Sequence, residues 1–277
     1  VRCTFKDGRT AETDSRFTFD STAPQPRFTA DWINLLGNAT HTATADSISS
    51  TPELTWVTNV GSNIFMTSPL IYDRTVYTAS IDENGGNTAH IYACNALDGS
   101  LRWKYPVANS IKNSIAIDSG LLFAQDVCGM LYAVDAITGQ LRWQHQLPVN
   151  GLPALVDGLV AADGVVYAGS GKALSAFDAA SGKLLWRNTG WGQGEGTTST
   201  LTVGSGVLIG SAQWSALHAN DAATGRLLWS RSERGLRNRG ASAAMHGSLL
   251  YIISQKSFFI LNALTGDIIV QKELPYN

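Results

Sequence analysis

Short apolar runs rich in β-branched and aromatic residues recur along most of the chain, which is the pattern of buried β-strands. These stretches are separated by glycine together with aspartate, asparagine, serine or threonine, residues that favour tight turns. The segment 159–170, LVAADGVVYAGS, is one example, with apolar runs on either side of an Asp-Gly pair. The pattern predicts a chain built of short antiparallel strands joined as hairpins.

One hairpin pattern recurs five times. Each copy has a turn glycine, an alanine three residues before it, and aspartate or asparagine four residues before it. A tryptophan follows four residues after the glycine in the first four copies, and Val270 takes its place in the fifth. The turn glycines are Gly99, Gly139, Gly182, Gly225 and Gly266, and they stand 40, 43, 43 and 41 residues apart.

Turn chemistry accounts for the repeated positions. A short side-chain oxygen at a strand end can accept hydrogen bonds from the backbone of the turn, and glycine adopts the positive φ that closes the hairpin. The aspartates Asp135, Asp178 and Asp221 are therefore predicted to cap turns rather than to take part in catalysis. A second hairpin precedes every copy, so each repeat is predicted to form four antiparallel strands.

Four-stranded sheets of this kind bury their faces against copies of themselves, and a period of 40 to 43 residues is typical of a propeller blade. The sequence therefore predicts an all-β fold, a β-propeller of four-stranded antiparallel blades closed into a ring, with five clear repeats. The recurring tryptophan is predicted to lie between neighbouring blades. Trp56 marks a further outer strand, so we prefer six blades; five blades with an added outer strand are the alternative.

The repeat resembles a known family. The segments AVDAITGQLRW (133–143) and AFDAASGKLLW (176–186) are similar to the tryptophan-docking motif of the PQQ-like, or quinoprotein-type, β-propeller repeat proteins. The segment 31–42, DWINLLGNATHT, is similar to the entry segment that precedes the first blade in many of these proteins. The resemblance implies an exported bacterial protein, periplasmic or attached to the cell surface.

Two regions are expected along the chain. Residues 1–26 are predicted to form a β-hairpin around Lys6, Asp7 and Gly8, followed by a linker, and residues 27–277 are predicted to form the propeller. The hairpin resembles the tail of a preceding domain, of the kind found before such propellers in some calcineurin-like phosphoesterases. A catalytic domain of that type would lie outside this chain.

Composition narrows the function classes. Apolar residues make up 44% of the 277 residues and charged residues 15%, so the chain can bury a large core. Lysine and arginine number 20 against 22 aspartates and glutamates, a balance that gives no overall attraction for nucleic acid. No apolar run is long enough for a transmembrane helix. The three cysteines form no CxxC pair, so neither a disulfide framework nor a zinc ribbon is expected.

The sequence contains no recognisable catalytic or metal-binding constellation. The five histidines are dispersed without HxH or HExxH spacing, and the loop DENGGN (82–87) lacks the spacing of an EF-hand. Quinoprotein dehydrogenases of the resembling family have about eight blades, a vicinal disulfide, a bound calcium and a catalytic aspartate, and this chain lacks the first two. We therefore expect no catalytic residue, no bound metal, and neither PQQ nor calcium as a cofactor.

Two loops are candidates for ligand binding, because function in propellers sits on the loops at one mouth of the ring. The loop 188–200 is long and carries an aromatic residue with a nearby amide and carboxylate, and the loop 231–240 is rich in arginine. The ordinary alternatives are an indole that covers the core and a solvated basic loop. The candidate ligand-binding residues are Trp191, Gln193, Glu195, Arg234, Arg237 and Arg239.

These observations favour a non-catalytic β-propeller that acts as a binding or interaction platform, as an accessory domain of a larger exported protein. One alternative is that the chain is part of an enzyme, either a PQQ-dependent oxidoreductase or the appended part of a phosphoesterase. Another is an envelope assembly scaffold, similar to the outer-membrane assembly lipoprotein of the same repeat family. The expected partner is a protein, a carbohydrate or an anionic ligand at one mouth of the propeller.

Overall fold

The computed structural model contains only β-strands as regular secondary structure within the residues that it describes. Twenty of these strands form five sheets of four strands, which confirms the predicted all-β fold and the four-stranded repeat. The described residues are 2–4, 10–12, 31–42, 54–82, 86, 88–112, 115–149, 158–170, 173–190, 200–211, 216–232, 236, 243–254 and 256–275.

Each sheet is an antiparallel meander whose strands neighbour one another in chain order. The first sheet consists of β3 (Leu70–Tyr72), β4 (Thr75–Ala79), β5 (His90–Asn95) and β6 (Leu101–Pro106). The second consists of β7 (Ile115–Asp118), β8 (Leu121–Gln125), β9 (Met130–Asp135) and β10 (Leu141–Gln146). The third consists of β11 (Leu159–Ala162), β12 (Val165–Gly169), β13 (Leu174–Asp178) and β14 (Leu184–Asn188).

The last two sheets repeat this plan. The fourth consists of β15 (Thr202–Gly204), β16 (Val207–Ser211), β17 (Leu217–Asp221) and β18 (Leu227–Arg231). The fifth consists of β19 (Ala244–His246), β20 (Leu249–Ser254), β21 (Ser257–Asn262) and β22 (Ile268–Glu273). Every hairpin predicted from the repeat is therefore present.

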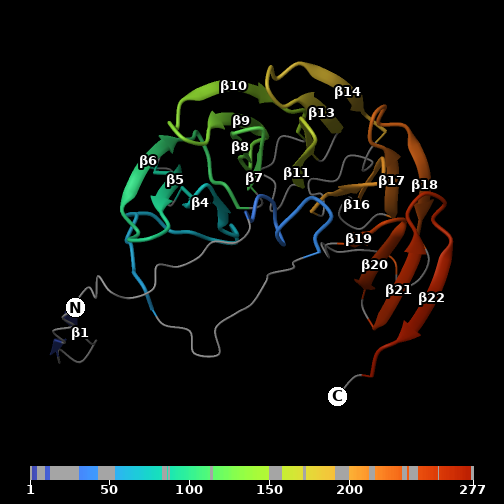
Figure 1. Cartoon of the computed structure of the whole chain (residues 1–277), viewed down its shortest axis with the longest axis horizontal. Coiled ribbons are helices and arrows are strands. Elements are labelled where there is room, and N and C mark those ends of the chain that lie inside the picture. The colour runs from blue at the N-terminus through green and yellow to red at the C-terminus, as the bar shows by residue number, and fades with distance from the viewer. Residues whose placement is uncertain are drawn as a thin grey trace.

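The five sheets follow one another along an arc, with the first strand of each sheet toward the centre and the fourth at the rim (Figure 1). Burial follows this arrangement, because all five residues of β8 are buried whereas all six residues of β22 are exposed. The core consists of layers between successive sheets, in which the middle strands supply fully buried side chains such as Phe123 and Phe177. Burial of both faces of the middle strands is what a stack of repeated sheets requires.

The segment 31–42 lies at the centre of the arc (Figure 1). It forms hydrogen bonds with the innermost strand of every sheet, from β3 to β19. These bonds join Trp32 to Ile71 (2.7 and 2.9 Å), Ile33 to Ile117 (2.7 Å), Asn34 to Ala161 (3.0 and 3.1 Å), Ala39 to Val203 (2.9 Å) and Thr40 to Met245 (2.8 Å). The predicted entry segment is thus a central tie between sheets that are distant in sequence.

The described residues form five complete blades, and one additional segment, 54–60, lies against the first of them. This segment has no assigned strand, but the Trp56 indole Nε1 donates to the Ala96 carbonyl of the first sheet at 2.8 Å. Trp56 therefore makes the contact that a tryptophan on the outer strand of a preceding blade would make. The described residues match the alternative of five blades with an added outer segment.

Near the N-terminus, β1 (Arg2–Thr4) and β2 (Thr10–Glu12) pair as an antiparallel hairpin in a sheet of their own. Arg2 pairs with Glu12 and Thr4 with Thr10. The predicted turn residues Lys6, Asp7 and Gly8 lie outside the described residues. The relation of this hairpin to a preceding domain stays a prediction.

Candidate functional site

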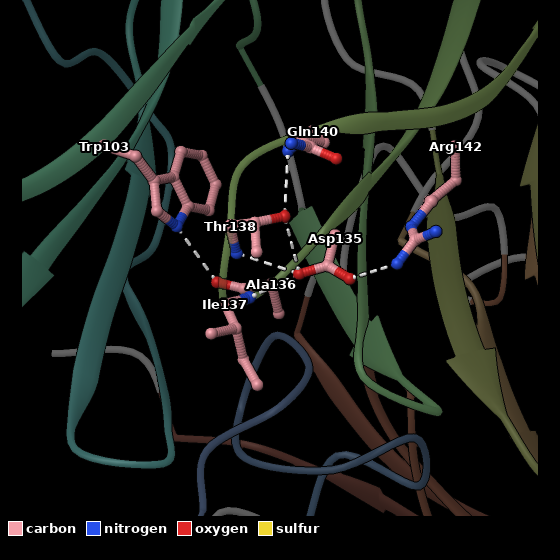
Figure 2. Close-up of polar contacts among 7 residues, drawn as sticks. All are labelled: Trp103, Asp135, Ala136, Ile137, Thr138, Gln140 and Arg142. Atoms are coloured by element: carbon pink, nitrogen blue, oxygen red, sulfur yellow. Dashed lines mark hydrogen bonds and ion pairs between the residues drawn. The ribbon is translucent and has the colours of Figure 1, made fainter.

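The contact between neighbouring sheets is built from one repeated turn, and Figure 2 shows the copy between the first and second sheets. The indole Nε1 of Trp103, on β6, donates to the carbonyl of Ala136 in the second sheet at 3.0 Å. Behind that carbonyl, Asp135 Oδ1 accepts from the backbone N–H groups of Ile137 (3.1 Å) and Thr138 (2.8 Å). One residue thus holds the turn in shape while the next receives the indole.

The same indole contact occurs at every junction between successive sheets. In each case the tryptophan of one sheet donates to the alanine carbonyl of the next sheet, 33 to 36 residues further along the chain. The pairs after Trp103 are Trp143 with Ala179 (2.9 Å), Trp186 with Ala222 (3.0 Å) and Trp229 with Ala263 (2.8 Å). Val270 has the position of the tryptophan in the fifth repeat. An indole there would bind a sheet that follows the fifth, and the described residues contain no such sheet.

The turn glycine makes room for the indole. Gly139 has φ +72°, and a Cβ atom added there would lie 2.6 Å from Cδ2 of Trp103. A side chain at this position would therefore both strain the backbone and overlap the ring. The glycine is invariant among the five copies for packing as well as for turn geometry.

The repeated aspartates have the properties of structural caps. Hydrogen bonds from Arg142 and then Thr138 lower the pKa of Asp135 to about 2. The pKa values of Asp178 and Asp221 are also lowered, chiefly by hydrogen bonds from Ser181 and Thr224 respectively. A carboxylate held in its ionised form by its own turn cannot serve as a general acid near neutral pH.

Each sheet presents two edges with different character. The turns between the first and second strands and between the third and fourth strands lie at one edge, which we call the turn edge. The connections between the second and third strands and between successive sheets lie at the opposite edge, which we call the loop edge. The indole contacts belong to the turn edge, whereas both predicted ligand-binding loops belong to the loop edge.

The structure does not test the predicted ligand-binding residues. Trp191, Gln193, Glu195, Arg234, Arg237 and Arg239 all lie outside the described residues. Of the same two loops, the structure describes the ends and Leu236, which is 0% exposed and packs in the core. At one end, Asn188 accepts from the Gly190 backbone at 2.9 Å and donates to the Gly225 carbonyl at 2.9 Å. The assignment of a ligand surface to these loops stays a prediction.

A groove of about 500 Å³ lies at the turn edge, between the third and fourth sheets. Its walls include the first turn of each sheet, at 162–165 and 203–206, and the indole-receiving turn at 221–223. Val165, Leu185 and Val203 give it an apolar wall, and Asp163, Tyr167 and Asp221 supply its ionisable groups. The described lining contains two carboxylates and no basic side chain.

Sequence reasoning missed this groove, although a signal was present. In the second sheet, Arg142 pairs with Asp135 at 2.7 Å, and Figure 2 shows this pair. The residue seven positions after Asp221 is Leu228, so the fourth sheet lacks the corresponding arginine. The arginine position of the third sheet is Leu185, which lines the groove and is 48% exposed. A comparison of the second copy with the third and fourth at this position would have indicated acidic turns that lack an arginine partner.

The centre of the arc holds a buried histidine. His41 is 3% exposed, and its Nδ1 donates to the Ala243 carbonyl at 3.1 Å, which the Thr202 hydroxyl also approaches at 2.7 Å. Its Nε2 has no hydrogen-bond partner among the described residues. Burial lowers the pKa of His41 to about 4, against the opposing effect of the Ala243 hydrogen bond, so the ring is neutral near pH 7.

The described residues contain no group of three or more histidine, cysteine, aspartate or glutamate side chains that could hold a metal ion. The polar side chains at the centre are engaged with protein groups: Asn34 bonds both backbone groups of Ala161, and Asn38 bonds Thr40 and Thr42. These amides are already bonded to protein groups, and an imidazole is not among the oxygen ligands that calcium takes, so the described centre does not fit a calcium ion. Within the described part of the chain there is also no helix of the length and apolar character needed to cross a membrane.

Comparison with protein families assigns the chain to one of them. Residues 39–152 and 149–277 match the family described as outer membrane protein assembly factor BamB. The chain belongs to this family. The match spans all five sheets of the BamB-type repeat and confirms the predicted resemblance to PQQ-like propeller repeats. No curated protein sequence matches the chain.

Solved structures of similar fold include members of the BamB family and quinoprotein enzymes. BamB from Moraxella catarrhalis is 22% identical with a TM-score of 0.61, over 79% of this chain and 66% of that one. The quinohemoprotein alcohol dehydrogenase ADHIIG from Pseudomonas putida HK5 is 16% identical with a TM-score of 0.66, over 88% and 48%. A europium-containing methanol dehydrogenase is 15% identical with a TM-score of 0.70, over 89% and 58%. The chain thus spans between about half and two thirds of these structures, and the likeness concerns the fold.

Proposed function

We propose that this chain is a non-catalytic interaction platform for a protein partner in the bacterial envelope. The observation that carries the proposal is the structural role of the repeated aspartates and tryptophans in the turns and at the junctions between sheets. The aspartates cap turns and the indoles bind the next sheet, so the repeat leaves no catalytic set among the described residues. The family description, which names assembly of outer membrane proteins, supports a scaffold role and an exported location.

The platform offers two edges for binding. The loop edge carries the long connections between sheets, including the loops 188–200 and 231–240, and the turn edge carries the groove between the third and fourth sheets. Loops that are not part of the sheet ladders can change without loss of the fold, which suits them to recognition. We expect a partner to bind an edge rather than the exposed outer strands.

The test is site-specific photo-cross-linking of the full chain in the source cell. A photoreactive amino acid is placed at Thr189 for the loop edge, at Ser205 for the turn edge, and at Lys104 on β6 as the matched outer-strand control; all three positions are exposed. We expect a discrete adduct with an envelope protein from at least one edge position and none from Lys104. Adducts from Lys104 alone, or from none of the three positions, would contradict the platform.

The alternative function is that of an oxidoreductase, because several solved structures of similar fold are quinoprotein dehydrogenases. At 15–16% identity that likeness concerns the fold, and the polar groups described at the centre do not fit a calcium site. We propose that the chain takes neither PQQ nor calcium. In the same study, addition of PQQ with calcium should leave the melting temperature of the purified protein unchanged, whereas a rise of several degrees would favour the enzyme.

A further inference from the structure

The groove between the third and fourth sheets has two carboxylates without a cation. Asp221 Oδ1 accepts from the backbone N–H and the hydroxyl of Thr224, both at 2.8 Å, and its other oxygen has no partner among the described residues. Asp163, in the first turn of the third sheet, is exposed and has no hydrogen bond or ion pair within the described chain. In the second sheet the equivalent free oxygen of Asp135 is neutralised by Arg142.

Tyr167 adds a hydroxyl to the lining of the groove, from a side chain that is otherwise largely buried. Tyr167 is 6% exposed and lines the groove, and no hydrogen bond to its hydroxyl is present among the described residues. The equivalent tyrosine of the first sheet, Tyr77, donates to the Ala136 carbonyl of the next sheet at 3.0 Å. At the third sheet the corresponding carbonyl, that of Ala222, accepts only from Trp186. A hydroxyl that lines the groove without a protein partner can accept a hydrogen bond from a ligand.

The electrostatics of the groove favour a cation. Burial, followed by the charges of Asp163 and Asp221, raises the pKa of Tyr167, so both carboxylates act on the same hydroxyl. Thr224 lowers the pKa of Asp221, which keeps that carboxylate ionised at neutral pH; the nearby Arg226 is the smallest of the contributions and is not part of the lining. Two negative charges and one hydroxyl acceptor can surround an ammonium or guanidinium group.

We propose that this groove binds a lysine or arginine side chain of a protein partner. Asp163 and Asp221 hold the charged head group, and the Tyr167 hydroxyl accepts one of its protons. Val165, Leu185 and Val203 contact the methylene stem, as apolar surface does for long basic side chains elsewhere. The inference rests on the proposed function, because it requires a partner that docks at the turn edge.

The repeat itself supplies substitutions that should preserve the fold. Ser119 and Ser205 occupy the position of Asp163 in the second and fourth sheets, with φ of 52° and 49° against 53° for Asp163. Asn95 and Asn262 occupy the position of Asp221. The double variant Asp163→Ser, Asp221→Asn therefore removes both charges with residues already present in equivalent turns. Asp178→Asn is the matched control, because it changes the same cap in the third sheet outside the groove lining.

Binding is measured by NMR on the full chain with the tripeptides acetyl-Gly-Lys-Gly-amide and acetyl-Gly-Arg-Gly-amide. The probe signal is the indole N–H of Trp186, which donates to the groove residue Ala222. We expect concentration-dependent shifts of this signal, which weaken as salt is raised. The double variant should bind about tenfold more weakly, as expected for the loss of a charge-assisted hydrogen bond, while Asp178→Asn should bind as the wild type does.

The neutral tripeptide acetyl-Gly-norleucine-Gly-amide decides whether charge matters. Equal shifts with this peptide, or unchanged binding of the cationic peptides to the double variant, would overturn the proposal. Dispersed indole signals in the double variant verify that it is folded. If the cross-linking experiment yields a partner and the double variant captures it equally well, the groove proposal fails while the platform stands. If the wild type captures no partner, the platform fails, and the peptide titration still decides what the groove binds.

Discussion

At the scale of single residues, burial at the centre of the molecule disfavours the protonated form of His41. The imidazole is buried and its Nδ1 donates to the Ala243 carbonyl. Burial lowers its pKa to about 4 from the ordinary 6.5, because the charged form loses its hydration inside the protein. The folded state therefore prefers the neutral ring, and protonation favours the unfolded chain.

We expect the contribution of His41 to the free energy of unfolding to be fully present above pH 6.5 and to fall as the pH is lowered toward 4. The shift corresponds to a loss of about 3 kcal/mol across that window. His41→Asn should reduce this slope, because asparagine tolerates the φ of 58° at this position and does not titrate. The contribution of His218, whose pKa burial also lowers, stays in both proteins. Urea unfolding of both proteins over the window measures the difference. Equal slopes would show that His41 does not set the pH dependence. The capped aspartates lose their contribution from about pH 5 downward, and His41→Asn leaves that part of the pH dependence in place.

At the scale of elements, the indole contact connects each outer strand to the next sheet. Trp143 on β10 donates to Ala179, and its ring lies 5.7 Å from that of Phe123 and 6.1 Å from that of Phe177. It therefore contacts aromatic residues of two sheets at once. A contact of this kind combines buried aromatic area with a satisfied N–H donor.

Trp143→Ala should lower the free energy of unfolding by about 3 to 5 kcal/mol, since it removes a large packed side chain and leaves the Ala179 carbonyl without its donor. Val270→Ala is the control, because this residue has the same repeat position but is 38% exposed on β22. We expect the control to change stability by less than about 1 kcal/mol. Denaturant unfolding compares the two, and similar losses at both positions would contradict the assigned role of the indole.

The elements were predictable from the sequence because each is specified locally. The Asp–Gly turn, the apolar strands and the docking tryptophan all fall within one repeat, so five copies gave five sheets. The groove was not predictable in the same way, because its walls come from two sheets and include Leu185 at a position where the two earlier copies have arginine. The role of 31–42 was also hidden, since Asn34 and its partner Ala161 are 127 residues apart.

At the scale of the whole molecule, two kinds of contact hold the arc together. The indole contacts join only successive sheets, as in other repeat proteins, in which stability is nearly a sum over neighbours. The segment 31–42 adds contacts of long range, since Asn34 reaches the third sheet and His41 reaches Ala243 beside the fifth, 202 residues away. Because of these contacts, we expect sheets that are not neighbours to unfold cooperatively.

Asn34 gives the sharpest test of that role, because its side chain is 1% exposed and bonds both the N–H and the carbonyl of Ala161. Asn34→Ala would leave two buried backbone groups unpaired, at a cost of about 2 to 4 kcal/mol. If the segment couples the sheets, hydrogen exchange should accelerate in the inner strands β3, β7, β15 and β19 as well as in β11, which Asn34 contacts directly. Asn38→Ala is the control, because among the described residues the Asn38 side chain bonds only within the segment, to Thr40 and Thr42. Acceleration confined to β11 in Asn34→Ala would show instead that each sheet is stabilised by its neighbours alone.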